Sequence, residues 1–203
     1  MMAGMPDISE ALANAVGHHQ AGRLAEAEEI YRRILAVEPD CAEAWHLLGV
    51  VAEELGRDAD AVEYSNRAIG LRPDLAEAHN NLGNALLNQG KSGDAIDCFS
   101  KALQLAPDIA EIHFNLGNAL RQQGNWEDAI ASYRKSLSLK PNFPKAHVNL
   151  GLVFHDQHEF EKAAACHRQA LDLNPDYAVA HYNLGKALKE QCSASHEAAQ
   201  SAS

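Results

Sequence analysis

The stretch AEAHNNLGNALLNQGKSGDAIDCFSKALQLAPDI, residues 76–109, decides the fold of this chain. The next 34 residues, 110–143, keep its pattern as AEIHFNLGNALRQQGNWEDAIASYRKSLSLKPNF. Both copies carry Leu-Gly near the start, Ala-Ile in the middle and a proline near the end. A fixed period of this length is typical of stacked helical hairpins, in which no repeat buries its apolar face alone.

The period extends in both directions without an insertion or a deletion. A proline and a glycine each recur every 34 residues, at Pro39, Pro73, Pro107, Pro141 and Pro175 and at Gly49, Gly83, Gly117, Gly151 and Gly185. This step predicts repeats at 8–41, 42–75, 76–109, 110–143 and 144–177, followed by a capping helix at 178–191. We expect residues 1–7 to be disordered and 192–203 to be disordered or frayed. The incomplete sixth repeat either caps the array or belongs to a longer natural protein.

Each repeat contains the signals of two helices and of the turn between them. The recurring glycine shares one stripe of the first helix with large apolar residues, and a recurring alanine lies on the second helix. These small residues predict a close approach of the two helices. Gly22, Gly56, Gly90 and Gly124 predict left-handed turns, and His158 replaces glycine in the fifth repeat. Acidic pairs after three of the prolines predict capping boxes: Asp40 with Glu43, Asp74 with Glu77, and Asp108 with Glu111.

The composition excludes several classes of function. A formal net charge of −11 argues against a nucleic-acid binder and disfavours an anionic membrane surface. No 18-residue apolar run and no secretory signal are found in the sequence. The four cysteines form no C-x-x-C pair, which favours free thiols in a reducing cytoplasm.

The repeat pattern resembles that of the tetratricopeptide repeat family. The second repeat matches the signature of that family at Trp45, Leu48, Gly49, Ala61, Ala68 and Pro73. The resemblance covers roughly residues 8–191 and implies an all-α, right-handed superhelical solenoid of antiparallel helix hairpins. The first repeat departs from the signature, with Asn14 and Ala15 where Leu and Gly are expected, and we interpret it as an N-terminal cap. In this family the first helices line a concave face, which usually binds extended peptides.

Asparagines recur on the side of the first helices that the resemblance assigns to this groove. The candidate groove residues are these asparagines and one lysine: Asn80, Asn81, Asn84, Asn88, Asn115, Asn118, Lys145, Asn149 and Asn183. An Asn amide offers two donors and an acceptor, so a row of amides is suited to binding the backbone of an extended chain. The row resembles the asparagine-lined repeats of protein O-linked N-acetylglucosaminyltransferases. The alternative interpretation is that duplication copied a harmless exposed residue.

Two other residue patterns bear on binding or metal chemistry. Asn84, Asn115 and Lys145 match three of the five positions with which related repeats hold acidic C-terminal tails, but Asn80 and Asn149 replace the other two, basic, residues. The histidines at the fourth position of successive repeats, His79, His113, His147 and His181, are too far apart for one metal ion. No catalytic arrangement is present in these residues, and no cofactor is expected.

The sequence therefore predicts a cytoplasmic, non-enzymatic scaffold that binds a protein or peptide segment in an Asn-lined groove. The alternative is the substrate-recruiting part of a larger transferase that resembles the O-linked N-acetylglucosaminyltransferases. Because the incomplete sixth repeat leaves an apolar edge at the C-terminal end of the array, we also expect self-association through this edge.

Overall fold

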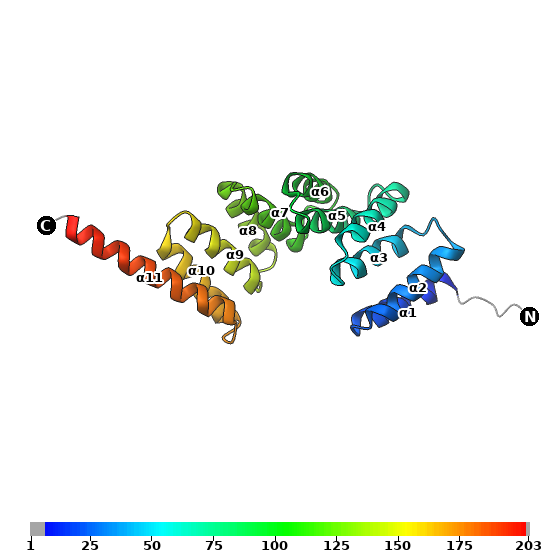
Figure 1. Ribbon diagram of the computed structural model, residues 1–203, viewed down its shortest axis with the longest axis horizontal. Helices are drawn as coiled ribbons and strands as arrows, with labels where there is room; N and C mark the ends of the chain where they lie inside the picture. The colour runs from blue at the N-terminus through cyan, green and yellow to red at the C-terminus, as the bar shows by residue number, and fades with distance from the viewer. Residues whose placement is uncertain (1–6, 202–203) are drawn as a thin grey trace, which may run out of the picture. The chain divides into compact units, whose positions relative to one another are not determined.

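Residues 7–201 are described by the computed structural model, and these residues form α-helices without a strand (Figure 1). The chain divides into two compact units between Pro107 and Asp108. We call them the N-terminal unit and the C-terminal unit. The all-α architecture predicted from the 34-residue period is confirmed.

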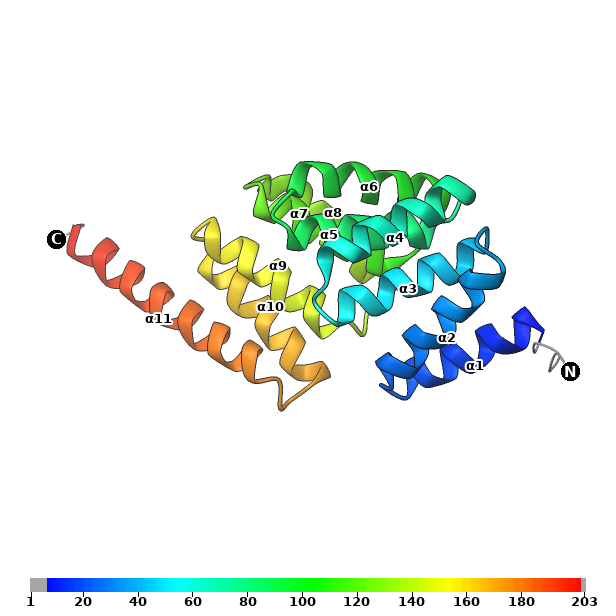
Figure 2. The ribbon, with the colours of Figure 1, turned by 45° about the vertical axis from the view of Figure 1, so that its right-hand side comes forward.

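The N-terminal unit consists of three helical hairpins. Its helices are α1 (Ile8–Gln20), α2 (Leu24–Val37), α3 (Ala42–Glu54), α4 (Asp58–Leu71), α5 (Ala76–Asn88) and α6 (Ser92–Leu105). Each helix packs on the next, and the first helices α3 and α5 also contact one another (Figures 1 and 2). Part of the core lies between the first two hairpins, where Tyr31, Ile34, Leu48 and Val51 are almost completely buried.

The C-terminal unit contains two hairpins and one long helix. Its helices are α7 (Ala110–Gln122), α8 (Trp126–Leu139), α9 (Pro144–Asp156), α10 (Phe160–Leu173) and α11 (Ala178–Ser201). The first helices again lie side by side, because α9 contacts both α7 and α11. Val148, Ala170 and Ala180 form a small core where α9, α10 and α11 meet.

The turns inside the hairpins have the conformation predicted from their residues. Gly22, Gly56, Gly90 and Gly124 all have φ between 70° and 78°. His158 takes the same place in the fifth repeat with φ of 60°, a conformation that costs a residue with a Cβ more than it costs glycine.

The glycines within the first helices make room for a side chain of the second helix. A Cβ atom added to Gly83 would lie 2.6 Å from the ring of Phe99. Gly117 faces Tyr133 and Gly151 faces His167 in the same way. The close approach predicted for the hairpin is therefore present, and a buried ring on the second helix sets it.

The predicted acidic capping boxes are wrong. Helices α3, α5 and α7 have Cys41, Leu75 and Ile109 at their N-caps, and none of these caps is bonded by a side chain. Since the helices begin after these residues, the aspartates lie in the preceding turn. A ring nitrogen stabilises that turn instead: Trp45 Nε1 donates to the carbonyl oxygen of Pro39 over 2.8 Å.

The ends of the array differ from the expected boundaries. Helix α11 continues to Ser201 instead of ending near residue 191. Its sequence after residue 191 contains Ala, Ser, Glu and Gln but no Pro or Gly, so nothing interrupts the helical backbone. At the other end Asp7 caps α1, and residues 1–6 lie outside the described part of the chain.

Candidate functional site

The candidate residues lie on the first helices of the repeats, and each unit is described separately. In the N-terminal unit they belong to α5, which lies beside α3. In the C-terminal unit they belong to α7, α9 and α11. We call the two sets of first-helix surfaces the N-terminal face (α1, α3 and α5) and the C-terminal face (α7, α9 and α11).

The asparagines of α5 form hydrogen bonds to the preceding repeat. Asn81 is buried, and its Nδ2 lies 3.0 Å from Nδ1 of His46 on α3. Burial lowers the pKa of His46, so its ring is neutral at pH 7 and Nδ1 accepts the hydrogen bond. Asn88 Nδ2 donates to Oδ1 of Asp58 over 2.9 Å. These amides thus hold adjacent repeats together as well as lining the face.

Asn84 forms a hydrogen bond with Glu53, a carboxyl group whose charged form is disfavoured by burial. Glu53 lies on α3, and the hydrogen bond from Asn84 lowers the pKa of its carboxyl. Burial has the larger and opposite effect and, with the charges of Asp58 and Glu54, raises the pKa of Glu53 to about 6. The N-terminal face therefore contains a partly buried acid next to an amide. Asn80, also on α5, is half-buried.

The asparagines of the C-terminal face form a cluster around the hydroxyl of Tyr133. Asn118 Oδ1 accepts hydrogen bonds from Tyr133 over 2.8 Å and from Nδ2 of Asn149 over 2.7 Å. Tyr133 is the ring that packs on Gly117, so the hairpin contact also positions these amides. Burial raises the pKa of Tyr133 to about 12, which keeps its hydroxyl neutral as a donor.

The other members of this face differ in exposure. Asn115 is half-buried and Lys145 is exposed on α9. Asn183 is buried, and its Nδ2 donates over 2.9 Å to the carbonyl oxygen of Val179 one turn earlier. Its amide is thus committed to its own helix. Asn115, Asn118 and Asn149 are the half-buried asparagines of this face.

Two of the histidines at the fourth position of the repeats contact the inter-repeat turns. Nε2 of His79 lies 2.9 Å from the carbonyl oxygen of Pro73, and His181 makes the same contact with Pro175 over 2.7 Å. Trp45 makes the equivalent bond in the second repeat. Within the residues whose side chains are described, no three His, Cys, Asp or Glu residues are grouped as metal ligands.

Sequence reasoning missed the residues that hold the amides in place. His46, Glu53 and Tyr133 each bond to a candidate asparagine. For Glu53 a signal was present, because it lies at a position of the first helix that the family resemblance assigns to the concave face. The role of Tyr133 depends on the contact across the hairpin, which the period alone does not specify.

Comparison with known sequences identifies the family. Profiles described as "TPR repeat" match residues 117–158 and 154–191, and profiles described as "Tetratricopeptide repeat" match residues 12–76, 76–109 and 98–131. These matches together span almost the whole helical array. The chain belongs to the tetratricopeptide repeat family. No curated protein matches the sequence.

Solved structures of tetratricopeptide repeat proteins share the fold. The crystal structure of MamA protein is 25% identical with a TM-score of 0.69, over 84% of this chain and 93% of that chain. Pseudomonas aeruginosa pilF gives a TM-score of 0.79 at 22% identity, over 95% and 89% of the two chains. YrrB, described as a TPR protein with an unusual peptide-binding site, gives 0.68 at 20% identity, over 87% and 91%. Among the described helices, none is both long and apolar enough to span a bilayer.

Proposed function

We propose that this tetratricopeptide repeat protein is a non-enzymatic scaffold that binds an extended protein segment on its first-helix faces. The observation that carries the proposal is the set of oriented amides on these faces. Asn84 is held by Glu53, and Asn149 is held by Asn118. Each amide has two N–H donors and one acceptor oxygen, so these bonds fix its orientation and leave further groups for a ligand.

The amides favour the backbone of the ligand over its side chains. An extended segment presents an N–H and a C=O at every residue, and an amide pairs with both. Asn81 and Asn183 are too buried to reach a ligand, so their part is to position the first helices. We assign binding to the half-buried and exposed members, which are Asn80, Asn84, Asn88, Asn115, Asn118, Lys145 and Asn149.

Selection of binders from a random-peptide display library, followed by affinity measurement, tests the proposal. Replacing Asn115, Asn118 and Asn149 of the C-terminal face by Ala should weaken a peptide that binds this face at least about tenfold, because each lost hydrogen bond is worth about 0.5–1.5 kcal/mol. The matched control replaces the exposed Asn66, Asn142 and Asn174, which lie on α4 and in inter-repeat segments. Methylation of the backbone nitrogens of the peptide should abolish binding. Equal affinity for both triple variants would contradict the proposal.

The asparagine row also supports a second function. In this alternative the repeats recruit protein substrates for a transferase domain like that of the O-linked N-acetylglucosaminyltransferases, carried by a longer form of the protein. The two functions share the binding step and differ in the coding sequence after Ser203. A downstream glycosyltransferase domain there would favour the second function.

The cellular setting follows from the thiols and the charge. Cys41, Cys98, Cys166 and Cys192 are free, which suits a reducing cytoplasm. The net charge of −11 opposes binding to nucleic acid or to an anionic membrane. We therefore propose a protein partner in the cytoplasm.

The open face of α11 supports self-association as an additional property. A Cβ on Gly185 would have no atom within 4 Å, whereas Gly83, Gly117 and Gly151 are each covered by a ring. Tyr182 on the same helix is 74% exposed. Sedimentation should therefore show a concentration-dependent dimer that Tyr182→Ser weakens, and a monomer at every concentration would contradict this.

A further inference from the structure

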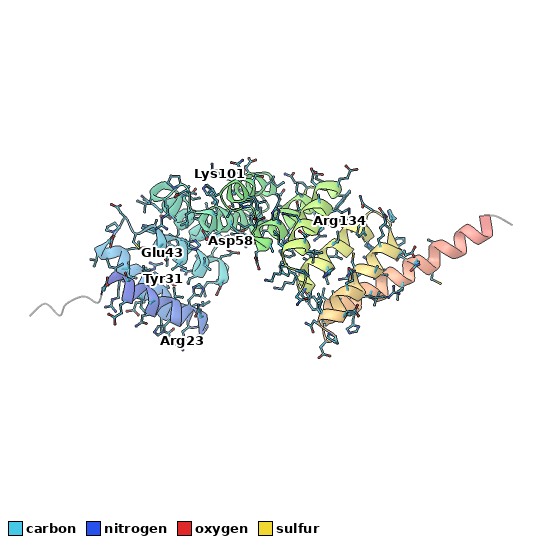
Figure 3. The ribbon with its side chains drawn as sticks, turned by 180° about the vertical axis from the view of Figure 1, so that it is seen from behind. Arg23, Tyr31, Glu43, Asp58, Lys101 and Arg134 are labelled. Atoms are coloured by element: carbon cyan, nitrogen blue, oxygen red, sulfur yellow. The ribbon has the colours of Figure 1, made fainter. Side chains whose placement is uncertain are left out.

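Charge is distributed unevenly along the chain and between its helices. Residues 1–107 contain eight Lys and Arg against seventeen Asp and Glu, and so carry −9 of the net charge of −11. All eight cations lie outside α1, α3 and α5, on the second helices or in the turns. Figure 3 shows an example of each class, with Glu43 on α3 and Lys101 on α6.

The N-terminal face accordingly carries acids without cations. Four carboxylates lie on α3 and α5 at repeat positions that the family resemblance assigns to the concave face: Glu43, Glu53, Glu54 and Glu77. Among the described residues none of them forms an ion pair with Lys or Arg. Their nearest recorded partners are weaker, since Glu54 lies 3.1 Å from His19 Nε2 and Glu53 bonds to the neutral amide of Asn84.

An acid on α2 in the same unit is neutralised by arginine. Glu28 on α2 accepts from Arg57 over 2.7 Å and from Arg32 over 2.8 Å. The hydrogen bond from Arg57 is the main cause of the lowered pKa of Glu28. Glu53 shows the opposite shift, because burial and two neighbouring acids act on it and no cation compensates. The unit thus pairs an acid of its second helices and leaves those of the N-terminal face unpaired.

The C-terminal face provides an internal comparison. Two of its acids are paired with cations, because Lys140 binds Glu111 and Arg121 lies 3.6 Å from Asp156. It also carries Lys145, Lys186 and Lys189. The C-terminal face thus mixes acids with cations, whereas α3 and α5 carry acids and neither Lys nor Arg.

We propose that the N-terminal face selects an extended segment rich in lysine or arginine. This inference rests on the proposed binding of extended segments and adds the chemical class of the partner. Cations of the ligand would pair with Glu43, Glu53, Glu54 and Glu77, while Asn80 and Asn84 contact its backbone. Half-buried Leu47, Val50 and Leu87 on the same helices would cover the alkyl stems of its side chains. An acidic segment would be repelled by the same carboxylates.

Fluorescence anisotropy with three labelled probe peptides tests the inference on the full chain. The peptides alternate serine with lysine, with glutamine or with glutamate, and are equal in length. The lysine peptide should bind most tightly, and its binding should weaken as salt is raised, because exposed charges are screened. The glutamate peptide should bind least.

Two variants with the same change in net charge distinguish binding by the N-terminal face from attraction by the net charge of the whole protein. The first replaces Glu43, Glu53, Glu54 and Glu77 by Gln. The second replaces four exposed acids of α2, α4 and α6 by amides: Glu26, Glu29, Glu63 and Asp97. The face variant should lose about tenfold in affinity for the lysine peptide, and the control about twofold or less. Circular dichroism melting confirms that both variants fold.

The outcomes distinguish this inference from the proposed function. If the glutamine peptide binds as tightly as the lysine peptide, extended-segment binding stands and charge selection is overturned. Equal losses in the two variants would show that net charge alone attracts the peptide, which also overturns the selection. Binding of none of the three peptides would contradict both proposals.

Discussion

Gly83 and Gly185 occupy the same place in different repeats but have opposite surroundings. A Cβ on Gly83 would lie 2.6 Å from the Phe99 ring, whereas a Cβ on Gly185 would have nothing within 4 Å. Gly83→Ala should therefore destabilise the protein by about 1–3 kcal/mol through overpacking. Gly185→Ala should stabilise α11 by up to about 1 kcal/mol, because alanine favours the helix. Urea unfolding of both variants measures the difference, and effects of the same sign would contradict the packing described.

In the fifth repeat the ring that packs on the first-helix glycine is His167, and this histidine lowers the stability of the protein at low pH. It is fully buried, neither ring nitrogen has a partner, and burial and the nearby His155 lower its pKa from 6.5 to about 4. The unfolded chain binds this proton below pH 6.5, but the folded chain binds it only near pH 4. Neutral His167 therefore does not lower the free energy of unfolding above pH 6.5. As the pH falls from 6.5 to 4, the free energy of unfolding decreases by at most about 1.4 kcal/mol per pH unit.

His167→Phe should remove this acid sensitivity and raise the melting temperature at pH 5 more than at pH 7.5. The reciprocal variant Phe99→His should introduce the same sensitivity in the third repeat, because Phe99 packs on Gly83 as His167 packs on Gly151. Melting curves at the two pH values measure both effects. An unchanged pH dependence in His167→Phe would show that other groups control acid unfolding.

At the scale of elements, the turn of the fifth hairpin differs from the other four. His158 has φ of 60°, where the equivalent residues are glycines. His158→Gly should stabilise this hairpin by about 1 kcal/mol, because glycine adopts left-handed backbone conformations without a steric penalty. The check is amide exchange in α9 and α10, which should slow on substitution. Faster exchange would mean that the ring contact between His158 and Phe160 matters more than the backbone strain.

The elements also show how far the sequence determines the structure. Glycine at the turn positions predicted the left-handed conformation because only the local backbone decides it. The predicted capping boxes were wrong because a capping side chain must lie at the residue just before the helix, and these helices begin one residue later than the boxes require. Trp45 and His79 instead stabilise the preceding turn by hydrogen bonds to proline carbonyls.

The sequence predicted on which helices the candidate asparagines lie, but it did not predict their hydrogen-bond partners. The period placed the asparagines on the first helices. It did not show that Asn81 is buried against His46 or that Asn118 accepts from Tyr133, because both contacts join residues from different helices. The proposed binding site therefore contains fewer residues than the row of asparagines in the sequence.

At the scale of the whole molecule, charge is concentrated in the N-terminal unit. It carries a net charge of −9, and the C-terminal unit carries −2. Self-repulsion should make the N-terminal unit less stable at low salt, because screening lengths then exceed the spacing of its surface charges. Raising the ionic strength to about 0.15 M should slow amide exchange more in α1–α6 than in α7–α11. Equal changes in the two units would contradict this.

The most direct test of the account is a titration of side-chain amides by nuclear magnetic resonance. A peptide chosen from the display library is added to ¹⁵N-labelled protein, and the NH₂ resonances of the asparagines are followed. When the peptide binds the C-terminal face, shifts are expected for Asn115, Asn118 and Asn149 and none for Asn66 or Asn142. Binding that leaves the first three unchanged and shifts the last two would place the ligand elsewhere and contradict the account.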